Sequence, residues 1–344
     1  MPEKLEPNAF VSAAPHGPIL DVRSPGEFER AHIPGAISFP LFTDEERARV
    51  GTIYKQIGKD AAVELGLEFV GPKLAKWVKE AKKLAVDNTV YVHCWRGGMR
   101  SGSMAWLLET AGIQVKLLVG GYKAYRNFVL SKLEEPIPLM VLGGKTGSGK
   151  TDILLEMKRR GVQVIDLEGI AHHRGSAFGH LGLEEQPTSE QFENILVGEL
   201  MQLDYSKPIW VEDESRHIGK VFMNAAFYDQ LRAAPVLFLD IEAKYRLPHL
   251  VDVYAHYPKE ELAHAIDKIK KRLGGDHAKN AHEALEIGNF SEVAAITLNY
   301  YDKAYVHGLE IRATEKIHRL VLATCDPHLQ TDAVMAHPLF LKIP

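Results

Sequence analysis

The stretch Val90-Tyr-Val-His-Cys-Trp-Arg-Gly-Gly-Met-Arg-Ser101 joins an apolar run to a single cysteine, a glycine-bearing loop and an arginine. Apolar residues then recur at helical spacing until Gly112: Met104, Leu107, Leu108 and Ala111. The stretch therefore predicts a buried strand, a loop around Cys94 and a helix that begins at Ser101.

This order places Cys94 at the N-terminus of a helix. Unpaired amides of the loop, the helix dipole and Arg100 would together stabilise a thiolate and any anion beside it. Cys94 and Arg100 are therefore candidate catalytic residues, and Arg96 of the same loop is a third. The alternative is a cysteine that only fills core space, a common fate of a free thiol.

A strand and a capped helix are predicted earlier in the chain. Pro18-Ile-Leu-Asp-Val-Arg23 reads as a short buried strand. Ser24, Pro25 and Glu27 then suit the N-cap, N1 and N3 positions of a helix. A turn at Pro34-Gly35 follows that helix.

Three motifs in order carry a family resemblance: Asp21-Val-Arg-Ser-Pro-x-Glu-Phe28, His32-Ile-Pro-Gly-Ala36, and Cys94 followed by Arg and Ser. This combination resembles the rhodanese family over residues 15–130. The resemblance implies that Asp21 and Arg23 hold the scaffold beside the active loop. It also implies that Cys94 carries sulfur as a persulfide.

The loop after Cys94 departs from the common rhodanese pattern. Five residues separate Cys94 from Arg100, where the common rhodanese loop has four, and five is also the count in cysteine phosphatases and their rhodanese-fold relatives. A longer loop presents more amides around a wider cradle. We therefore expect it to seat a tetrahedral oxyanion rather than only a bare sulfur atom.

The composition sets outer bounds on the class of protein. A chain of 344 residues with 46% hydrophobic and 25% charged residues is expected to form about two soluble globular domains. Two cysteines give no disulfide framework, and no run approaches the ~18 apolar residues of a membrane span. The expectation is a protein of the cytoplasm without membrane contact. Its net charge of −4 means that nucleic acid would need a local basic patch.

A short stiff linker divides the chain into two predicted domains. Residues 1–133 form the rhodanese-like domain, Glu134-Glu-Pro-Ile-Pro138 is the linker, and residues 139–344 form the second domain. The fold class is thus α/β, with a rhodanese-like domain and a P-loop NTPase-like domain that has a parallel sheet and a helical C-terminal part.

The second domain opens with a Walker A loop in its required context. A strand, Leu139-Met-Val-Leu142, precedes Gly144-Lys-Thr-Gly-Ser-Gly-Lys-Thr151, and a helix runs on to Arg160. The predicted phosphate-binding residues are Gly144, Gly147, Ser148, Gly149, Lys150 and Thr151. The hydroxyl of Thr151 suits a magnesium ion. The loop does not identify the phosphate compound, and ATP or GTP is not excluded.

Three acids follow a further predicted strand of this domain. Val162–Asp166 reads as a second parallel strand, and Pro208–Val211 as a third that ends in Glu212, Asp213 and Glu214. The acids occupy the natural Walker B position, so Glu212 and Asp213 are predicted at the phosphate site. Any of the three could hold magnesium through water or act as a general base.

A basic helix is predicted near the end of the chain. Pro258–Leu273 has an inward stripe at Leu262, Ile266, Ile269 and Leu273, and its last turns carry Lys268, Lys270, Lys271 and Arg272. Cations at a helix C-terminus are favourable through the dipole alone. The sharper interpretation is contact with the phosphates of a nucleic acid.

Further motifs appear in one order along the chain: Gly51-Thr-Ile-Tyr-Lys-Gln56, His173-Arg-Gly-Ser-x-Phe-Gly179, Gln186-Pro-Thr-x3-Phe-Glu-Asn194 and Glu212-Asp-Glu-Ser215. With both loops, they make the chain resemble the tRNA 2-selenouridine synthase family over nearly its whole length. The resemblance implies replacement of the sulfur of 2-thiouridine at the tRNA wobble position by selenium from selenophosphate. It further implies an S-geranyl-2-thiouridine intermediate made from geranyl diphosphate.

The resemblance implies two ways of delivering selenium, and two rival functions remain. Cys94 could carry the selenium as a perselenide, which we favour, or its loop could deliver selenophosphate directly. An enzyme that supplies selenophosphate is a further expected partner. The first rival is a rhodanese-fold cysteine phosphatase. The second is a sulfurtransferase coupled to an ATP-dependent kinase domain.

Overall fold

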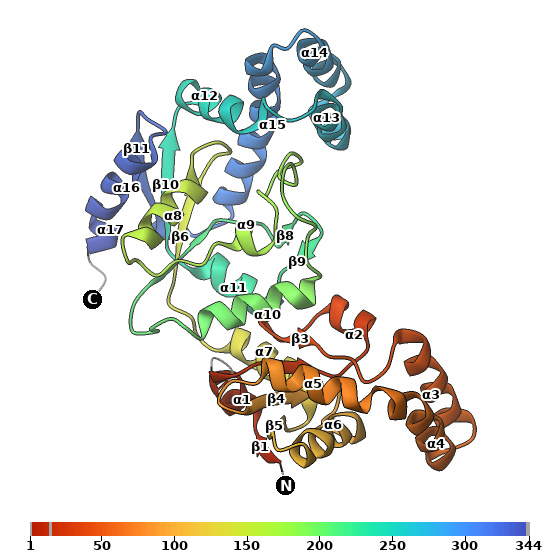
Figure 1. Cartoon of the computed structure of the whole chain (residues 1–344). Coiled ribbons are helices and arrows are strands. Elements are labelled where there is room, and N and C mark those ends of the chain that lie inside the picture. The colour runs from red at the N-terminus through yellow and green to blue at the C-terminus, as the bar shows by residue number, and fades with distance from the viewer. Residues whose placement is uncertain (1, 14–15, 342–344) are drawn as a thin grey trace. The chain divides into compact units, whose positions relative to one another are not determined.

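The computed structural model describes residues 2–13 and 16–341. They form two compact units (Figure 1). The first unit comprises the residues up to Lys132 together with residues 193–197, and the second comprises residues 133–192 and the chain from Gly198 on. Each unit is built on a parallel sheet flanked by helices. The predicted α/β class is confirmed.

The first unit carries a five-stranded sheet in the order β1-β5-β4-β2-β3. Its strands are β1 (Glu3–Leu5), β2 (Ile19–Asp21), β3 (Ile37–Ser38), β4 (Thr89–His93) and β5 (Gln114–Leu118). Its helices are α1 (Pro7–Ala13), α2 (Pro25–Arg30), α3 (Asp44–Gln56), α4 (Lys59–Val70), the 3-10 turn Gly71–Lys73, α5 (Leu74–Leu84), α6 (Met99–Thr110) and α7 (Gly121–Glu134), which runs past the unit boundary.

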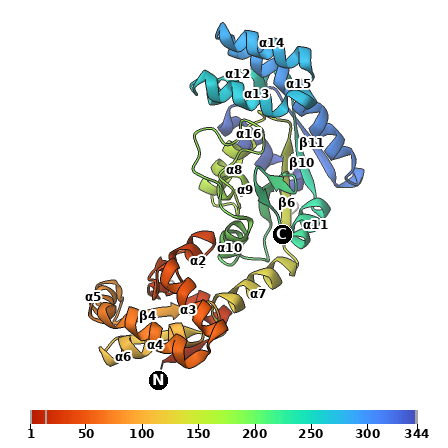
Figure 2. The ribbon, with the colours of Figure 1, turned by 90° about the vertical axis from the view of Figure 1, so that its right-hand side faces the viewer.

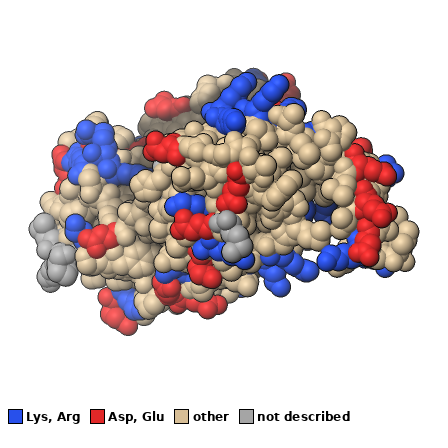
Figure 3. All heavy atoms as spheres, turned by 60° about the horizontal axis from the view of Figure 1, so that its bottom comes forward, with Lys and Arg blue, Asp and Glu red and all other residues tan. Residues whose placement is uncertain are grey.

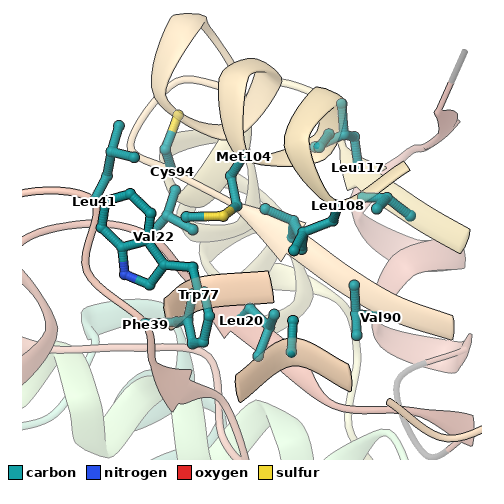
Figure 4. Close-up of a cluster of buried hydrophobic side chains, with 14 of the residues drawn as sticks. Leu20, Val22, Phe39, Leu41, Trp77, Val90, Cys94, Met104, Leu108 and Leu117 are labelled. Carbon is teal, nitrogen blue, oxygen red and sulfur yellow. The ribbon is translucent and has the colours of Figure 1, made fainter. Parts of the chain in front are cut away.

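Alternation along β4 sends its side chains to two different packing layers. Val90 and Val92 join the core cluster that contains residues of α5 and α6, including Trp77, Met104 and Leu108 (Figure 4). Tyr91 packs edge-on against Phe10 of α1, with ring centroids 5.5 Å apart. Both faces of β4 are therefore covered, which explains why its sequence is apolar almost throughout.

The second unit carries a four-stranded sheet in the order β11-β10-β6-β7. Its strands are β6 (Leu139–Gly144), β7 (Ile209–Glu212), β10 (Val236–Ile241) and β11 (Ile317–Leu322), beside a small hairpin of β8 (His217–Ile218) and β9 (Val221–Phe222). Its helices are α8 (Lys150–Arg159), α9 (Leu167–Ile170), α10 (Ser189–Leu200), α11 (Ala225–Ala233), α12 (Ala243–Tyr254), α13 (Lys259–Leu273), α14 (Gly275–Glu286), α15 (Phe290–Glu310), the 3-10 turn Thr314–Lys316, α16 (Pro327–Ala336) and α17 (Pro338–Leu341).

A group of helices forms the predicted helical part of this unit. Helices α12, α13, α14 and α15 pack on one another, as both ribbon views show (Figures 1 and 2). The inward stripe of α13 is confirmed, because Leu262, Ile266, Ile269 and Leu273 are all buried in one cluster. The chain then returns to the sheet and adds β11 beside β10, a strand that the sequence analysis missed.

The structure corrects two predicted elements. Helix α6 begins at Met99 rather than Ser101, so Arg100 lies within its first turn. The stretch Val162–Asp166 is not a regular strand and makes only an isolated parallel bridge between Val164 and Trp210. It leaves the sheet because Asp166 caps α9, accepting a hydrogen bond from the Gly169 amide at 2.7 Å.

Candidate functional site

Cys94 follows directly after β4 and lies at the floor of its loop. Its side chain is only 3% exposed and belongs to the edge of the core cluster, near Leu41 and Met104 (Figure 4). Its Sγ lies 3.2 Å from Oγ of Ser101, whose hydroxyl is 3.3 Å from the carbonyl oxygen of Gly98. The thiol is therefore positioned by the first turn of α6, while the loop from Trp95 to Met99 is exposed above it.

The start of α7 holds the back of this loop. The amide of Tyr122 donates to the carbonyl of Cys94 at 2.8 Å, and the amide of Lys123 donates to that of Trp95 at 2.9 Å. A Cβ added at Gly121 would lie 2.4 Å from both the Cys94 carbonyl oxygen and the Gly97 nitrogen. Only glycine fits there. The pair Gly120-Gly121 is thus part of the site, and it was not among the predicted site residues.

The two predicted arginines of the loop lie in different environments. Arg96 is exposed. Arg100 donates through Nη1 to Oε2 of Glu27 at 2.6 Å, and Nη2 lies 3.4 Å from Oε1. Burial opposes the charge of Glu27, but the Arg100 guanidinium outweighs that and lowers the pKa of this carboxyl. The cation expected to face the anion is therefore held by a carboxylate of α2.

A buried ion pair supports the loop from behind, where the rhodanese resemblance placed it. Arg23 donates through Nε to Asp21 at 2.9 Å and through Nη2 to the carbonyl of Ala31 at 2.7 Å. Its guanidinium also lies over the ring of Tyr122, 3.9 Å from the centroid. Burial opposes the charge of Asp21, yet His93 and the Arg23 guanidinium together lower the pKa of Asp21.

An apolar groove borders the Cys94 loop within the same unit. Helices α3 and α4, which form the insertion after Phe42, face the start of α6 across it. Leu41, Leu67, Val70 and Met99 line two adjoining pockets, each of which also includes Ser103. Leu67 and Met99 are 64% and 55% exposed. The site thus combines the exposed loop over Cys94 with an apolar surface.

The phosphate loop lies between β6 and α8, as predicted. Gly147 and Gly149 have φ of +78° and +76°, conformations that favour glycine. Lys150 donates to the carbonyl of Gly144 at 3.1 Å, and the Thr151 hydroxyl donates to Glu168 at 2.9 Å. The pocket over the loop has a volume of about 460 Å³ and is lined by all six predicted residues: Gly144, Gly147, Ser148, Gly149, Lys150 and Thr151.

Three residues far away in sequence brace this loop, and none was anticipated. Arg246 donates to the carbonyl of Thr146 at 2.8 Å and forms a two-pronged ion pair with Asp302, with donor–acceptor distances of 2.9 and 2.7 Å. Gln330 donates to the carbonyl of Ser148 at 3.2 Å. The thiol of Cys325 lies 3.7 Å from the carbonyl oxygen of Gly147. Their partners are backbone carbonyls, so sequence spacing carries no signal for them.

The acids after β7 have separate surroundings. Glu212 is fully buried and accepts a hydrogen bond from the Leu167 amide at 2.9 Å, so it holds α9 and does not line the pocket. Glu212, which the sequence analysis placed at the phosphate site, is therefore not among the residues that line this pocket. Asp213 lines the pocket but accepts hydrogen bonds from Arg312 at 2.6 Å and Tyr305 at 2.8 Å.

A carboxylate pair faces the phosphate loop instead. Glu214 and Glu168 both line the pocket, and a Cβ added at Gly175 would lie 2.8 Å from Glu214 Oε1 and 3.1 Å from Glu168 Oε1. Burial, and then the neighbouring Glu168 carboxylate, raise the pKa of Glu214 well above its ordinary value. Glu168 was not predicted, because nothing in the sequence links the residues after Asp166 to the Walker A loop.

Oxygen ligands at this position fit a magnesium ion. Among residues 2–13 and 16–341, no three His, Cys, Asp or Glu side chains form a metal cluster. Magnesium, however, needs only one or two carboxylates when phosphates and water supply the remaining ligands. Thr151, Glu168 and Glu214 offer such oxygens, and a cation would offset the repulsion between the two carboxylates.

The basic side chains of α13 lie at the surface, and two tyrosines of α15 have structural partners. Lys268, Lys270, Lys271 and Arg272 are all exposed. Tyr301 accepts a hydrogen bond from the Ala177 amide at 2.8 Å, and Tyr305 accepts one from the Gly144 amide at 2.9 Å.

On the face shown in Figure 3, basic and acidic side chains are interspersed. In the described part of the chain, no helix is long and apolar enough to span a membrane.

Comparisons with known proteins agree with this architecture. A family model described as "tRNA 2-selenouridine synthase AAA domain" matches residues 137–334, and one described as "Rhodanese-like domain" matches residues 7–128. A tRNA 2-selenouridine synthase of Bdellovibrio bacteriovorus is 44% identical, and the match covers 86% of this chain and 89% of that one. The enzyme of Shewanella pealeana is 35% identical, with 86% and 90% covered. The chain therefore belongs to the tRNA 2-selenouridine synthase family.

Proposed function

We propose that this enzyme replaces the sulfur of 2-thiouridine at the wobble position of tRNA with selenium, by way of an S-geranyl-2-thiouridine intermediate. Geranyl diphosphate and selenophosphate are the two co-substrates. The observation that carries the proposal is the presence, in a chain of this family, of both a phosphate loop and an exposed glycine-bearing loop over a buried thiol. Selenophosphate would come from a separate enzyme.

The phosphate loop is assigned the first step. The sulfur of 2-thiouridine attacks the first carbon of the geranyl group. The carbon–oxygen bond breaks as the carbon–sulfur bond forms, diphosphate leaves with the electron pair, and the base loses its N3 proton to solvent. Lys150 and the amides of residues 147–151 would stabilise the leaving group. Magnesium bound by Thr151, Glu168 and Glu214 would neutralise part of its charge.

The Cys94 loop is assigned the second step. Alkylation turns the sulfur into a better leaving group. The selenium of selenophosphate attacks C2 of the base, the carbon–sulfur bond breaks, and geranylthiolate leaves with the electron pair. Water then cleaves the phosphorus–selenium bond, so that phosphate leaves and selenium stays on the base. Selenophosphate is a tetrahedral anion of the kind that the exposed loop amides would hold. The apolar groove beside Met99 supports this assignment, because a geranylated base brings an apolar chain to the site.

Nucleoside analysis of one purified 2-thiouridine tRNA, incubated with enzyme and both co-substrates, tests the proposal. Lys150→Ala should leave plain 2-thiouridine, because the diphosphate is not neutralised. Cys94→Ser should accumulate geranylated 2-thiouridine without selenouridine, because a serine hydroxyl is almost never ionised at neutral pH. Lys158→Ala, at an exposed lysine of α8 outside the loop, is the control and should still produce selenouridine.

Two outcomes would contradict parts of the proposal. If Cys94→Ser makes selenouridine at a near wild-type rate, the thiol does not carry selenium and the loop only holds the anion. If Cys94→Ser fails to geranylate, the division of the two steps between the loops is wrong. Hydrolysis of an aryl phosphate by the wild-type enzyme would favour a cysteine phosphatase, and nucleotide turnover without tRNA would favour a kinase.

A further inference from the structure

An apolar pocket adjoins the phosphate loop in the second unit. It lies among α12, α13, α15 and the loop after Arg174. We propose that this pocket holds the hydrocarbon chain of an isoprenyl diphosphate whose diphosphate lies on the phosphate loop. This inference rests on the proposed function and adds the part of the enzyme that selects the organic group. Its apolar wall includes Leu250, Tyr254, Leu262, Phe290, Val293 and Leu298.

The apolar pocket and the phosphate pocket adjoin each other. Leu250, Tyr254 and Tyr301 line both of them, together with Thr146 and Ser176. Leu250 also packs directly on the phosphate loop, since a Cβ added at Gly147 would lie 2.7 Å from its Cγ. A diphosphate held by the loop amides would therefore have its ester oxygen next to an apolar entrance.

The polar groups of the apolar pocket are already engaged within the protein. The hydroxyl of Thr297 donates to the carbonyl of Val293 at 2.9 Å. The hydroxyls of Tyr301 and Ser176 accept from backbone amides of the neighbouring loop, at 2.8 and 3.2 Å. A nucleobase placed there would lose its hydrogen bonds to water without replacement, whereas a hydrocarbon chain loses none. The pocket therefore favours an isoprenyl group over a nucleoside.

The shape of the space agrees with an extended chain. The apolar pocket has a volume of about 50 Å³, and the phosphate pocket that it joins has about 460 Å³. A cavity of roughly 150 Å³ holds the six carbons of benzene, so the apolar pocket by itself is too small for a whole ten-carbon chain. The narrow pocket thus takes the far end of a thin chain, and the carbons nearer the diphosphate lie in the wider space.

Calorimetric titration of the full-length wild-type chain with dimethylallyl diphosphate, geranyl diphosphate and GDP tests the inference. The two prenyl diphosphates carry the same charged group, so their difference reports the chain alone. Five additional buried carbons should make geranyl diphosphate bind about tenfold tighter or more. Geranyl diphosphate should also bind more tightly than GDP.

A matched pair of variants on α15 locates the effect. Ala294 lines the apolar pocket, and its neighbour Ala295 is not among the lining residues. Ala294→Phe should fill the pocket and remove most of the preference for geranyl over dimethylallyl diphosphate, while Ala295→Phe should keep it. The chain-length comparison on the wild-type protein stands even if Ala294→Phe does not fold.

The outcomes separate this inference from the proposed function. Equal affinity for the two prenyl diphosphates, or tighter binding of GDP, would overturn the pocket assignment. Loss of the chain-length preference in both phenylalanine variants would also overturn it. Failure of the wild-type protein to bind either prenyl diphosphate would overturn the proposed function itself. Lys150→Ala should weaken both prenyl diphosphates alike, because it acts on the charged group.

Discussion

Arg100 of the Cys94 loop donates to the carboxylate of Glu27 at 2.6 Å. The same carboxylate accepts a hydrogen bond from the Ser24 amide at 3.1 Å as part of the capping box of α2. One side chain therefore both caps a helix and holds the cation that the sequence assigns to anion binding. An anion in the loop must compete with Glu27 for Arg100.

Glu27→Gln should strengthen anion binding at the Cys94 loop. Glutamine keeps the capping interaction, but it no longer neutralises Arg100. Protection of Cys94 against iodoacetamide by inorganic phosphate, followed by peptide mass spectrometry, reports this binding. The half-protecting concentration should fall about fivefold. Glu29→Gln on the same helix is the control, and equal protection in both variants would mean that Arg100 does not meet the anion.

Asp21→Asn should destabilise the first unit by about 3–5 kcal/mol, because it leaves Arg23 as an uncompensated buried charge. The lowered pKa of Asp21 means that its charge stabilises the fold above the unfolded pKa of about 4, and this stabilisation is lost only as the pH falls through the folded pKa. The cost should thus be constant from about pH 5 to 8.

Amide hydrogen exchange in β2 and β4 measures this cost locally. The exposed Asp87→Asn is the control and should change stability by no more than about 0.5 kcal/mol. A cost that already declines at pH 6 would show that Asp21 is not held in its charged form.

Tyr305→Phe should loosen the phosphate loop. The hydroxyl accepts from the Gly144 amide and donates to Asp213, so its loss leaves two partners unsatisfied, at a cost of about 1–3 kcal/mol. Urea unfolding should show the loss of stability, and calorimetry should show weaker binding of inorganic diphosphate. Tyr54→Phe, at a residue that is 59% exposed, should change neither quantity.

Neutralising Lys268, Lys270, Lys271 and Arg272 together should weaken tRNA binding and reduce its salt dependence. Each lost phosphate contact flattens the log–log slope of affinity against salt by roughly 0.7 to 0.9. The measurement is filter binding at several salt concentrations. An unchanged slope would show that these cations do not contact tRNA phosphates.

Local sequence patterns were sufficient to predict most helices and strands of both units. The capping box at Ser24 and the stripe of α13 were readable because their interactions span only three or four residues. Strand β11 was missed because its burial alternates only partly, and it is held as an edge strand by its pairing with β10. The stretch Val162–Asp166 was predicted as a full strand but forms only the bridge at Val164, because an apolar run does not reveal where a chain leaves a sheet.

The sequence by itself determined the two reactive loops, because a Walker A loop and a cysteine loop are contiguous and their backbone conformations follow from local glycines. Only the tertiary structure decided which side chains face those loops. Glu212 supports α9 while Glu168 and Glu214 face the phosphate site, and Glu27 holds Arg100. The physical reason is that the interaction between two charges depends on their distance in space. Glu27 and Arg100 are 73 positions apart in the sequence, and this separation does not indicate that their side chains meet.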